Sequence, residues 1–183
     1  MAVWYQGNLP VAVVTNMSSE IQDSRSQVQK VVGLVIFLVA CLGIGGLGGI
    51  ATAPEIKGWY TTLTKPSWNP PNWIFGPMWT TLFVMMAVSA WLVWKRPGVR
   101  LSSPPMILFA IQLVLNSAWS WIFFNMHMIG AAFAELCVLW VAIAATMFVF
   151  FKFSKLAGGL LIPYLAWVTF AGCLNYAIWR LNS

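Results

Sequence analysis

Five long apolar segments limit what this chain can fold into more than any other feature. The segments are 31–53, 73–94, 104–124, 130–151 and 156–179. Each is long enough to cross a bilayer, which takes about 20 apolar residues in a helix. Helices pair their own backbone groups inside lipid, and no alternating strand pattern suggests a small barrel. The sequence therefore predicts an all-α, polytopic membrane protein built as a bundle of five transmembrane helices.

The residues before the first apolar segment have a different character. They are polar and mixed from residue 18 to residue 30, and they lack the basic start of a signal peptide. We expect residues 1–30 to form a disordered N-terminal extension. The remaining residues, 31–181, are expected to form one membrane domain, because the connections between the apolar segments are short.

The basic residues are divided unevenly between the two ends of the predicted bundle. Arg25, Lys30, Lys95, Arg96, Arg100, Lys152 and Lys155 fall on the N-terminal side, whereas Lys57, Lys65 and Arg180 fall on the other. The positive-inside rule predicts a cytoplasmic N-terminus in a bacterial plasma membrane, and an organellar membrane such as the mitochondrial one is the alternative. The net charge of +6 suits anionic headgroups rather than nucleic acid, because no soluble basic face is present.

A proline- and tryptophan-rich loop follows the first apolar segment. It reads Lys65-Pro66-Ser67-Trp68-Asn69-Pro70-Pro71-Asn72-Trp73. The three prolines fix their own φ angles and restrict the residues before them, so this stretch does not continue a helix. We predict a rigid aromatic lid at the edge of the membrane.

Polar side chains at membrane depth indicate which faces turn inward. Gln112, Asn116, Trp119 and Phe123 recur at helical spacing and are expected on one inward stripe of the third helix. Glu135 is the only acid within a span, and we expect it to be neutral or hydrogen-bonded to an amide such as Asn116. An interhelical hydrogen bond is favoured over proton chemistry for this residue.

The fifth segment carries a second set of polar residues. Asn175 lies within it, beside a predicted stripe of Thr169, Gly172, Tyr176 and Arg180. We expect this stripe to face the same interior as the stripe of the third helix.

Glycines and prolines are expected to shape the packing of the helices. Gly45 and Gly49 form a pair that allows another helix to approach closely, either within the bundle or across a homodimer. Pro77 and Pro163 interrupt the second and fifth segments and are expected to bend both helices around a central space.

No pattern of residues supports a metal site. His127 is the only histidine, and its place in a short loop is typical of an interfacial residue. Cys41, Cys137 and Cys173 lie far apart without CxxC spacing, which argues against both zinc and a disulfide.

The twelve tryptophans do not all have the same explanation. Those at the ends of the segments suit the aromatic belt of a membrane protein. Trp79 and Trp119 instead lie several residues inside their helices, and Trp79 shares a face with Phe83. Indole surfaces in these positions could hold a flat apolar ligand, with packing as the alternative interpretation.

Together these motifs resemble the TspO/MBR family of tryptophan-rich sensory proteins and mitochondrial translocator proteins. The resemblance covers residues 31–181 and is carried by Trp59-Tyr60, Lys65 to Pro71, Trp73-Ile74-Phe75-Gly76-Pro77-Met78-Trp79, Leu115-Asn116-Ser117-Ala118-Trp119-Ser120 and Pro163-Tyr164-Leu165-Ala166-Trp167. It implies a five-helix bundle, usually dimeric, that binds porphyrins and other tetrapyrroles in a pocket capped by the first loop. Some members bind sterols.

The resemblance also implies the residues of the pocket. They are Trp68, Trp79, Phe83, Asn116, Trp119, Ser120 and Tyr176. The ligand expected there is protoporphyrin IX or haem, and no obligatory cofactor is implied. The two carboxylates of a porphyrin would then lie near Lys57, Lys65 or Arg180.

Three functions follow from these expectations. The first is a tetrapyrrole-binding sensor, carrier or regulator of porphyrin levels. The second is a light- and oxygen-dependent porphyrin-degrading enzyme in which Trp79 and Tyr176 act as electron partners. Some bacterial members carry Trp where Tyr176 stands, which argues against this activity. The third is sterol binding or transport, implied by the motif Leu174, Tyr176 and Arg180.

Overall fold

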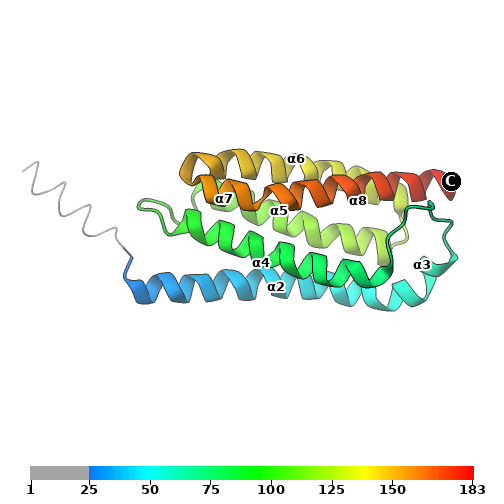
Figure 1. Ribbon diagram of the computed structural model, residues 1–183, viewed down its shortest axis with the longest axis horizontal. Helices are drawn as coiled ribbons and strands as arrows, with labels where there is room; N and C mark the ends of the chain where they lie inside the picture. The colour runs from blue at the N-terminus through cyan, green and yellow to red at the C-terminus, as the bar shows by residue number, and fades with distance from the viewer. Residues whose placement is uncertain (1–24) are drawn as a thin grey trace, which may run out of the picture.

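The computed structural model describes residues 25–183, which form helices joined by short loops (Figure 1). The elements are α2 (Gln27–Lys57), α3 (Trp59–Thr62), the 3-10 helix η1 (Asn72–Ile74), α4 (Phe75–Trp94), α5 (Pro104–Ser120), the π-helix η2 (Trp121–Asn125), α6 (Ile129–Phe153), α7 (Lys155–Leu160) and α8 (Ile162–Leu181). They supply five helical spans long and apolar enough to cross a membrane, and each contains one predicted segment. The predicted all-α fold with five spans is confirmed.

The first span begins at Gln27 instead of residue 31 because a capping box defines its start. The Ser26 hydroxyl accepts a hydrogen bond from the Gln29 backbone N–H at 3.2 Å, and the Gln29 side chain accepts one from the Ser26 N–H at 2.9 Å. These bonds satisfy donors that a helix end leaves unpaired. The predicted boundary at residue 30 is therefore too late, and the prediction of disorder for residues 1–24 lies outside the described residues.

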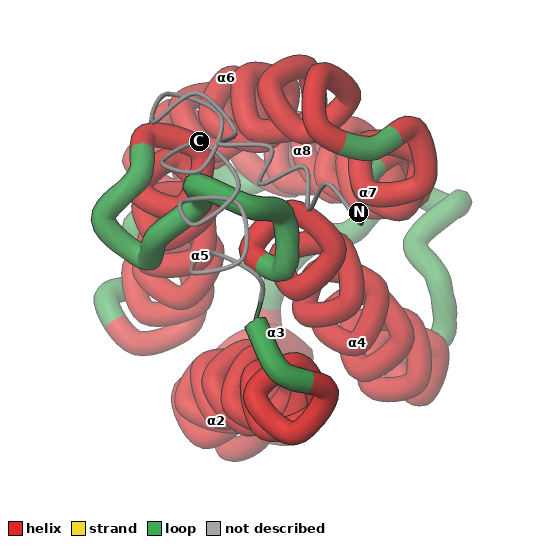
Figure 2. The backbone as a smooth tube through the Cα atoms, turned by 90° about the vertical axis from the view of Figure 1, so that its left-hand side faces the viewer, coloured by secondary structure: helices red, strands yellow, loops and turns green. Residues whose placement is uncertain are grey.

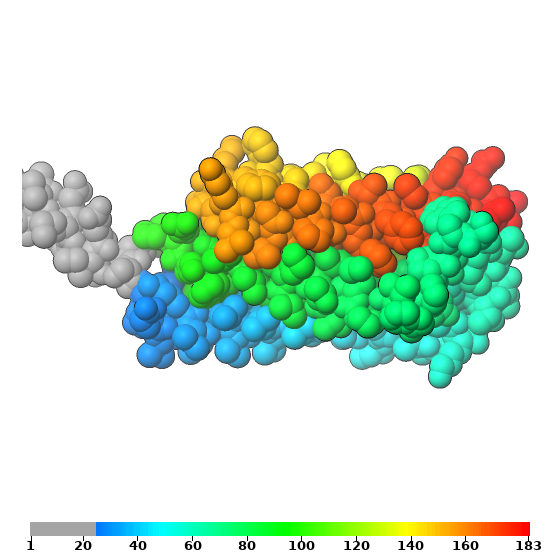
Figure 3. Space-filling view, in the orientation of Figure 1, coloured from blue at the N-terminus to red at the C-terminus, as the bar shows by residue number. Residues whose placement is uncertain are grey.

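The spans alternate in direction and pack around a common interior. α2 packs against α4 and α5, while α6 packs against α5, α7 and α8 on the opposite side of the bundle (Figure 2). At the end that carries α3, the loop after α3 lies against the C-terminal end of α8 (Figure 3). This arrangement leaves α2, α4, α5 and α8 around one internal space.

Glycines allow α2 to approach α4 closely. A Cβ atom at Gly45 would lie 2.5 Å from Cε2 of Phe83, and one at Gly33 would collide with the indole of Trp94. Gly43 and Gly49 have no such neighbour within 4 Å. The two glycines of the predicted pair therefore have different surroundings. Gly45 packs against α4 inside the bundle, whereas Gly49 does not. The homodimer stays a prediction.

The two predicted proline kinks have different outcomes. Pro77 lies in the first turn of α4 and does not interrupt the helix, since a helix tolerates proline there. The predicted bend at Pro77 is therefore wrong. Pro163 is the second residue of α8, directly after the break at Leu161 that separates α7 from α8. The fifth span is interrupted as expected. Pro54 lies inside α2, near its C-terminal end.

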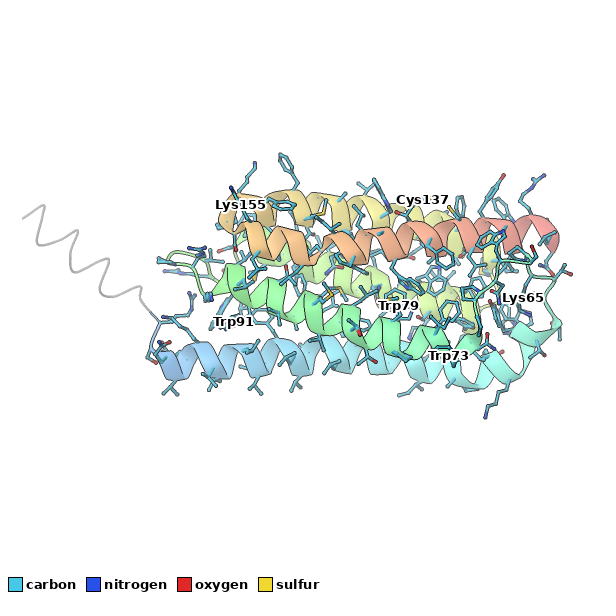
Figure 4. All side chains as sticks on the ribbon, in the orientation of Figure 1. Lys65, Trp73, Trp79, Trp91, Cys137 and Lys155 are labelled. Atoms are coloured by element: carbon cyan, nitrogen blue, oxygen red, sulfur yellow. The ribbon has the colours of Figure 1, made fainter. Side chains whose placement is uncertain are left out.

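The two ends of the bundle carry the basic residues as the sequence predicts. Lys155 lies at the end where α2 begins, and Lys65 lies at the opposite end (Figure 4). The Arg25 guanidinium donates to the carbonyls of Arg96 and Val99 and lies 4.2 Å from the centre of the Trp94 ring. The chain is therefore a multi-pass integral membrane protein whose ends differ in charge.

Replacing Gly45 tests the close contact between α2 and α4. We expect Gly45→Ala to destabilise the bundle by about 1–3 kcal/mol, because the Phe83 ring must move out of a packed position. Gly43→Ala, on the open side of the same helix, should be neutral or slightly stabilising. Thermal unfolding in detergent, followed by circular dichroism, checks both variants. Equal unfolding temperatures for the Gly45 and Gly43 variants would contradict a close contact between Gly45 and Phe83.

Candidate functional site

A cavity of about 570 Å³ lies between α2, α4, α5 and α8, near the end of the bundle that carries α3. Its wall is mainly apolar and aromatic, with a few small and polar side chains. The principal wall residues are Gly45, Gly48, Thr52 and Ile56 of α2; Phe75, Trp79 and Phe83 of α4; Asn116, Trp119, Ser120 and Phe123 of α5 and η2; and Trp167, Leu174, Asn175 and Ile178 of α8.

Aromatic rings form two walls of the cavity. On α4, the Trp79 and Phe83 rings lie 5.9 Å apart between centroids, and Trp79 also contacts Tyr164 edge to face at 6.3 Å. On α5 and η2, Trp119 stacks on Phe123 at 5.3 Å. These contacts fix the ring planes, so the cavity presents flat apolar surfaces on two of its sides.

Hydrogen bonds between helices hold the polar side chains of the cavity wall. The Asn116 amide donates to the Tyr164 hydroxyl at 2.9 Å, which joins α5 to α8. The Trp119 indole N–H donates to Asn175 Oδ1 at 3.1 Å, and Asn175 Nδ2 donates to the Ile129 carbonyl at 2.9 Å. α5, α6 and α8 are therefore fixed relative to one another by paired polar groups at membrane depth.

The predicted inward stripe of the third span is confirmed. Gln112, Asn116 and Phe123 are buried, and Trp119 is half-buried against the core. Five of the seven predicted pocket residues line the cavity, namely Trp79, Phe83, Asn116, Trp119 and Ser120. Their role in binding a ligand stays a prediction.

The predicted hydrogen bond between Glu135 and Asn116 is wrong. Asn116 uses its amide on Tyr164, and both carboxylate oxygens of Glu135 are buried without a hydrogen-bond partner in the described part of the chain. The Gln112 side-chain amide is likewise unpaired. Asn116 faces α8 in this bundle, so Tyr164 of α8, and not Glu135 of α6, is its hydrogen-bond partner.

Tyr176 is not part of the cavity wall, in contrast to the prediction. Its side chain is 46% exposed and contacts Phe133, with ring centroids 5.3 Å apart, on the outer surface. The neighbouring Asn175 faces inward, and adjacent residues of a helix point about 100° apart. The predicted inward stripe of the fifth span is therefore displaced by one residue.

Other residues of that stripe follow the same displacement. Thr169 and Arg180 are exposed, and only Gly172 of the predicted stripe is buried. The buried residues of α8 are Tyr164, Val168, Gly172, Leu174, Asn175 and Ile178. The sterol motif is split by this geometry, because Leu174 lines the cavity whereas Tyr176 and Arg180 lie outside it.

Trp68 also lies away from the cavity. It is 48% exposed and packs edge to face on Phe170 of α8, with centroids 5.9 Å apart. Tyr60, which precedes the loop, and Asn72 and Trp73, at its C-terminal end, line the cavity instead. Sequence reasoning missed these three, although Trp59-Tyr60 and Trp73 belong to the motifs that carried the resemblance.

The loop is tied to α3 by side chains at the same end. The Tyr60 hydroxyl donates to Asn69 Oδ1 at 3.0 Å, and Lys65 Nζ lies 4.6 Å from the Tyr60 ring centre while donating to the Leu63 carbonyl. Burial raises the pKa of Tyr60 to about 12, still further above neutral pH than the ordinary value for tyrosine.

Three basic residues lie at this end of the bundle, outside the cavity wall. Lys57 and Arg180 are exposed, and Lys65, the first residue of the loop, is half-buried. Glu55 is paired with His127 at 3.1 Å, and the His127 ring stacks on Trp59 at 4.1 Å between centroids. Within residues 25–183, no group of three or more His, Cys, Asp or Glu side chains could hold a metal ion.

Comparisons with known proteins match this architecture to one family. The TspO/MBR family model matches residues 36–180. The tryptophan-rich protein TspO of Chlorobaculum tepidum is 42% identical over 158 residues, covering 84% of this chain and 98% of its own length. Human translocator protein is 44% identical over 126 residues, covering 68% and 75% respectively. The tryptophan-rich sensory protein of Cereibacter sphaeroides is 39% identical over 146 residues, covering 80% and 89%.

Removing the Asn175 amide tests the polar network of the cavity wall. We expect Asn175→Ala to lower the free energy of unfolding by about 1–3 kcal/mol, because the Trp119 indole N–H loses its acceptor and the hydrogen bond to the Ile129 carbonyl is lost. Cys173→Ala, on the exposed face of the same helix, serves as the control. Thermal unfolding in detergent compares the two. Unfolding temperatures equal to that of the unmodified protein in both variants would show that the network does not stabilise the fold.

Proposed function

The chain belongs to the TspO/MBR family, and we propose that it binds a tetrapyrrole such as protoporphyrin IX or haem in the cavity between α2, α4, α5 and α8. In this role it acts as a membrane sensor, carrier or regulator of porphyrin levels. The aromatic cavity near one end of the bundle is the observation that carries the proposal.

The shape and surface of the cavity suit a flat apolar ring. Its volume of about 570 Å³ falls within the range of about 300–1,000 Å³ that is usual for small-molecule sites. Trp79 and Trp119 offer indole faces from different helices, on which the ring can stack. Asn116 and Asn175 already have partners, so an apolar ligand leaves few polar groups of the wall unpaired.

The charges at the end of the bundle that carries α3 suit the carboxylates of a porphyrin. Lys57, Lys65 and Arg180 lie at the same end of the bundle as the cavity. Lys65 is held by one hydrogen bond to a backbone carbonyl and a contact with the Tyr60 ring, an arrangement that a carboxylate can replace. The ligand would then lie with its ring inward and its acids toward the loop.

The loop supplies the protection that a photoreactive ligand needs. Tyr60 precedes it, Asn72 and Trp73 form its C-terminal end, and all three line the cavity. Excluding water strengthens the ion contacts at the rim, because the local dielectric constant falls. Controlled access of this kind suits a sensor or a carrier.

Binding is favoured over the two other functions by the position of Tyr176. This side chain lies on the outer surface, away from a ring held between Trp79 and Trp119. One of the two aromatic partners expected for porphyrin degradation is thus absent from the cavity. The sterol motif is divided between the cavity and the outer surface and defines no single site there.

Protoporphyrin titration of the purified protein, followed by tryptophan quenching in the dark, tests the proposal. We expect saturable quenching, and we expect Trp79→Ala to raise Kd by about tenfold because a stacking face is lost. Trp140→Ala is the matched control, since Trp140 lies on the outer face of α6 and is bonded to Thr169. Tyr176→Ala should also bind normally.

Three outcomes separate the alternatives. The absence of saturable quenching in the unmodified protein would overturn the tetrapyrrole proposal. Equal losses of affinity in the Trp79 and Trp140 variants would overturn the assignment of the cavity. Illumination of the complex adds a further readout, because bleaching of the porphyrin to a defined product that requires Trp79 would indicate the enzyme instead.

A further inference from the structure

We propose that Asn182, directly after the last helix, is a latch that fastens the loop of residues 63–71 over the cavity and sets how fast a ligand enters and leaves. Asn182 lies outside the cavity wall and outside every motif discussed above. The effect on ligand exchange rests on the proposed function, whereas the effect on the loop does not.

The latch consists of two hydrogen bonds to a single residue of the loop. The Thr64 backbone N–H donates to Asn182 Oδ1 at 2.9 Å, and Asn182 Nδ2 donates to the Thr64 carbonyl at 2.9 Å. One side-chain amide thus pairs both backbone groups of Thr64, as a neighbouring strand would in a sheet. This pairing requires a donor and an acceptor on the same side chain.

Asn182 is itself held firmly by the end of α8. Its backbone N–H donates to the Trp179 carbonyl at 3.2 Å, and its Nδ2 donates to the Ile178 carbonyl at 2.7 Å. Carbonyls in the last turn of a helix lack a partner within the helix, so these bonds satisfy groups that would otherwise need water. The amide is therefore oriented before the loop reaches it.

Other hydrogen bonds of the loop do not tie it to the rest of the bundle. In the described part of the chain, those of Tyr60, Lys65 and Asn69 all end on residues between positions 58 and 74. They give the loop its internal shape and would move with it. The contact of Trp68 with Phe170 is the second point where the loop meets α8. Figure 3 shows the loop (teal) lying against the end of α8 (red).

Movement of the loop would open the cavity at its end. Tyr60 and Trp73, on either side of the loop, line the cavity, and so does Ile178, whose carbonyl holds the Asn182 amide. The latch thus connects the cavity wall of α8 with a loop whose two flanks, Tyr60 on one side and Asn72 and Trp73 on the other, line the cavity. Weakening it should favour the open loop and speed both binding and release.

Hydrogen–deuterium exchange of the ligand-free protein is the first test. In Asn182→Ala, the amide of Thr64 and its neighbours should exchange about tenfold faster or more, the change expected for the loss of two hydrogen bonds. Asn182→Asp keeps the acceptor and loses the donor, so its effect should be intermediate. Ser183→Ala is the control, because that hydroxyl donates only to the Trp179 carbonyl in the same turn. If hydrogen–deuterium exchange of the loop amides is unchanged in Asn182→Ala, the proposal that Asn182 fastens the loop is wrong.

Stopped-flow mixing with protoporphyrin is the second test. We expect Asn182→Ala to raise the association and dissociation rates together by a similar factor, with a much smaller change in Kd and in the unfolding temperature. Rates equal to those of Ser183→Ala, in a variant whose loop does exchange faster, would overturn the role of the latch in ligand access. A failure of all variants to bind protoporphyrin would instead refute the proposed function and leave the loop result intact.

Discussion

The structure depends on one constraint, which is that polar groups inside a membrane must find their partners within the protein. Asn116, Trp119, Tyr164 and Asn175 meet this requirement across three helices. Their hydrogen bonds set the spacing of α5, α6 and α8, and the cavity exists because these helices are held in place around it. Glu135 and Gln112 are exceptions to this constraint, because their buried side-chain polar atoms have no partner among the described residues.

The shape of the cavity also depends on how closely α2 approaches the other helices. Glycines at positions 33 and 45 let α2 pack on Trp94 and Phe83, and Gly48 meets Ser120 of α5. The open glycine positions at this end, such as Gly49, leave room for the cavity instead of filling it. Large aromatic rings on one side and small residues on the other thus give a flat, apolar space.

Much of this architecture can be predicted from the sequence, because the length of an apolar segment directly reflects the thickness of the bilayer. The inward stripe of α5 was also predictable, since two amides at helical spacing must face the protein. Which face of α8 turns inward could not be predicted in the same way, because Asn175 and Tyr176 are adjacent and both are polar enough to suggest an inward position. The position of Trp68 and the partner of Glu135 depend on how distant segments meet, which no local pattern records. The latch at Asn182 joins residues far apart in the chain for the same reason.

The most direct test of the account is an experimental structure of the protein with protoporphyrin in a lipid bilayer. The account predicts that the ring lies between Trp79 and Trp119, with its carboxylates directed toward the loop and the basic residues at that end. A ring bound on the outer surface beside Tyr176 and Phe133, or a cavity filled by an aromatic side chain while the porphyrin binds elsewhere, would contradict it.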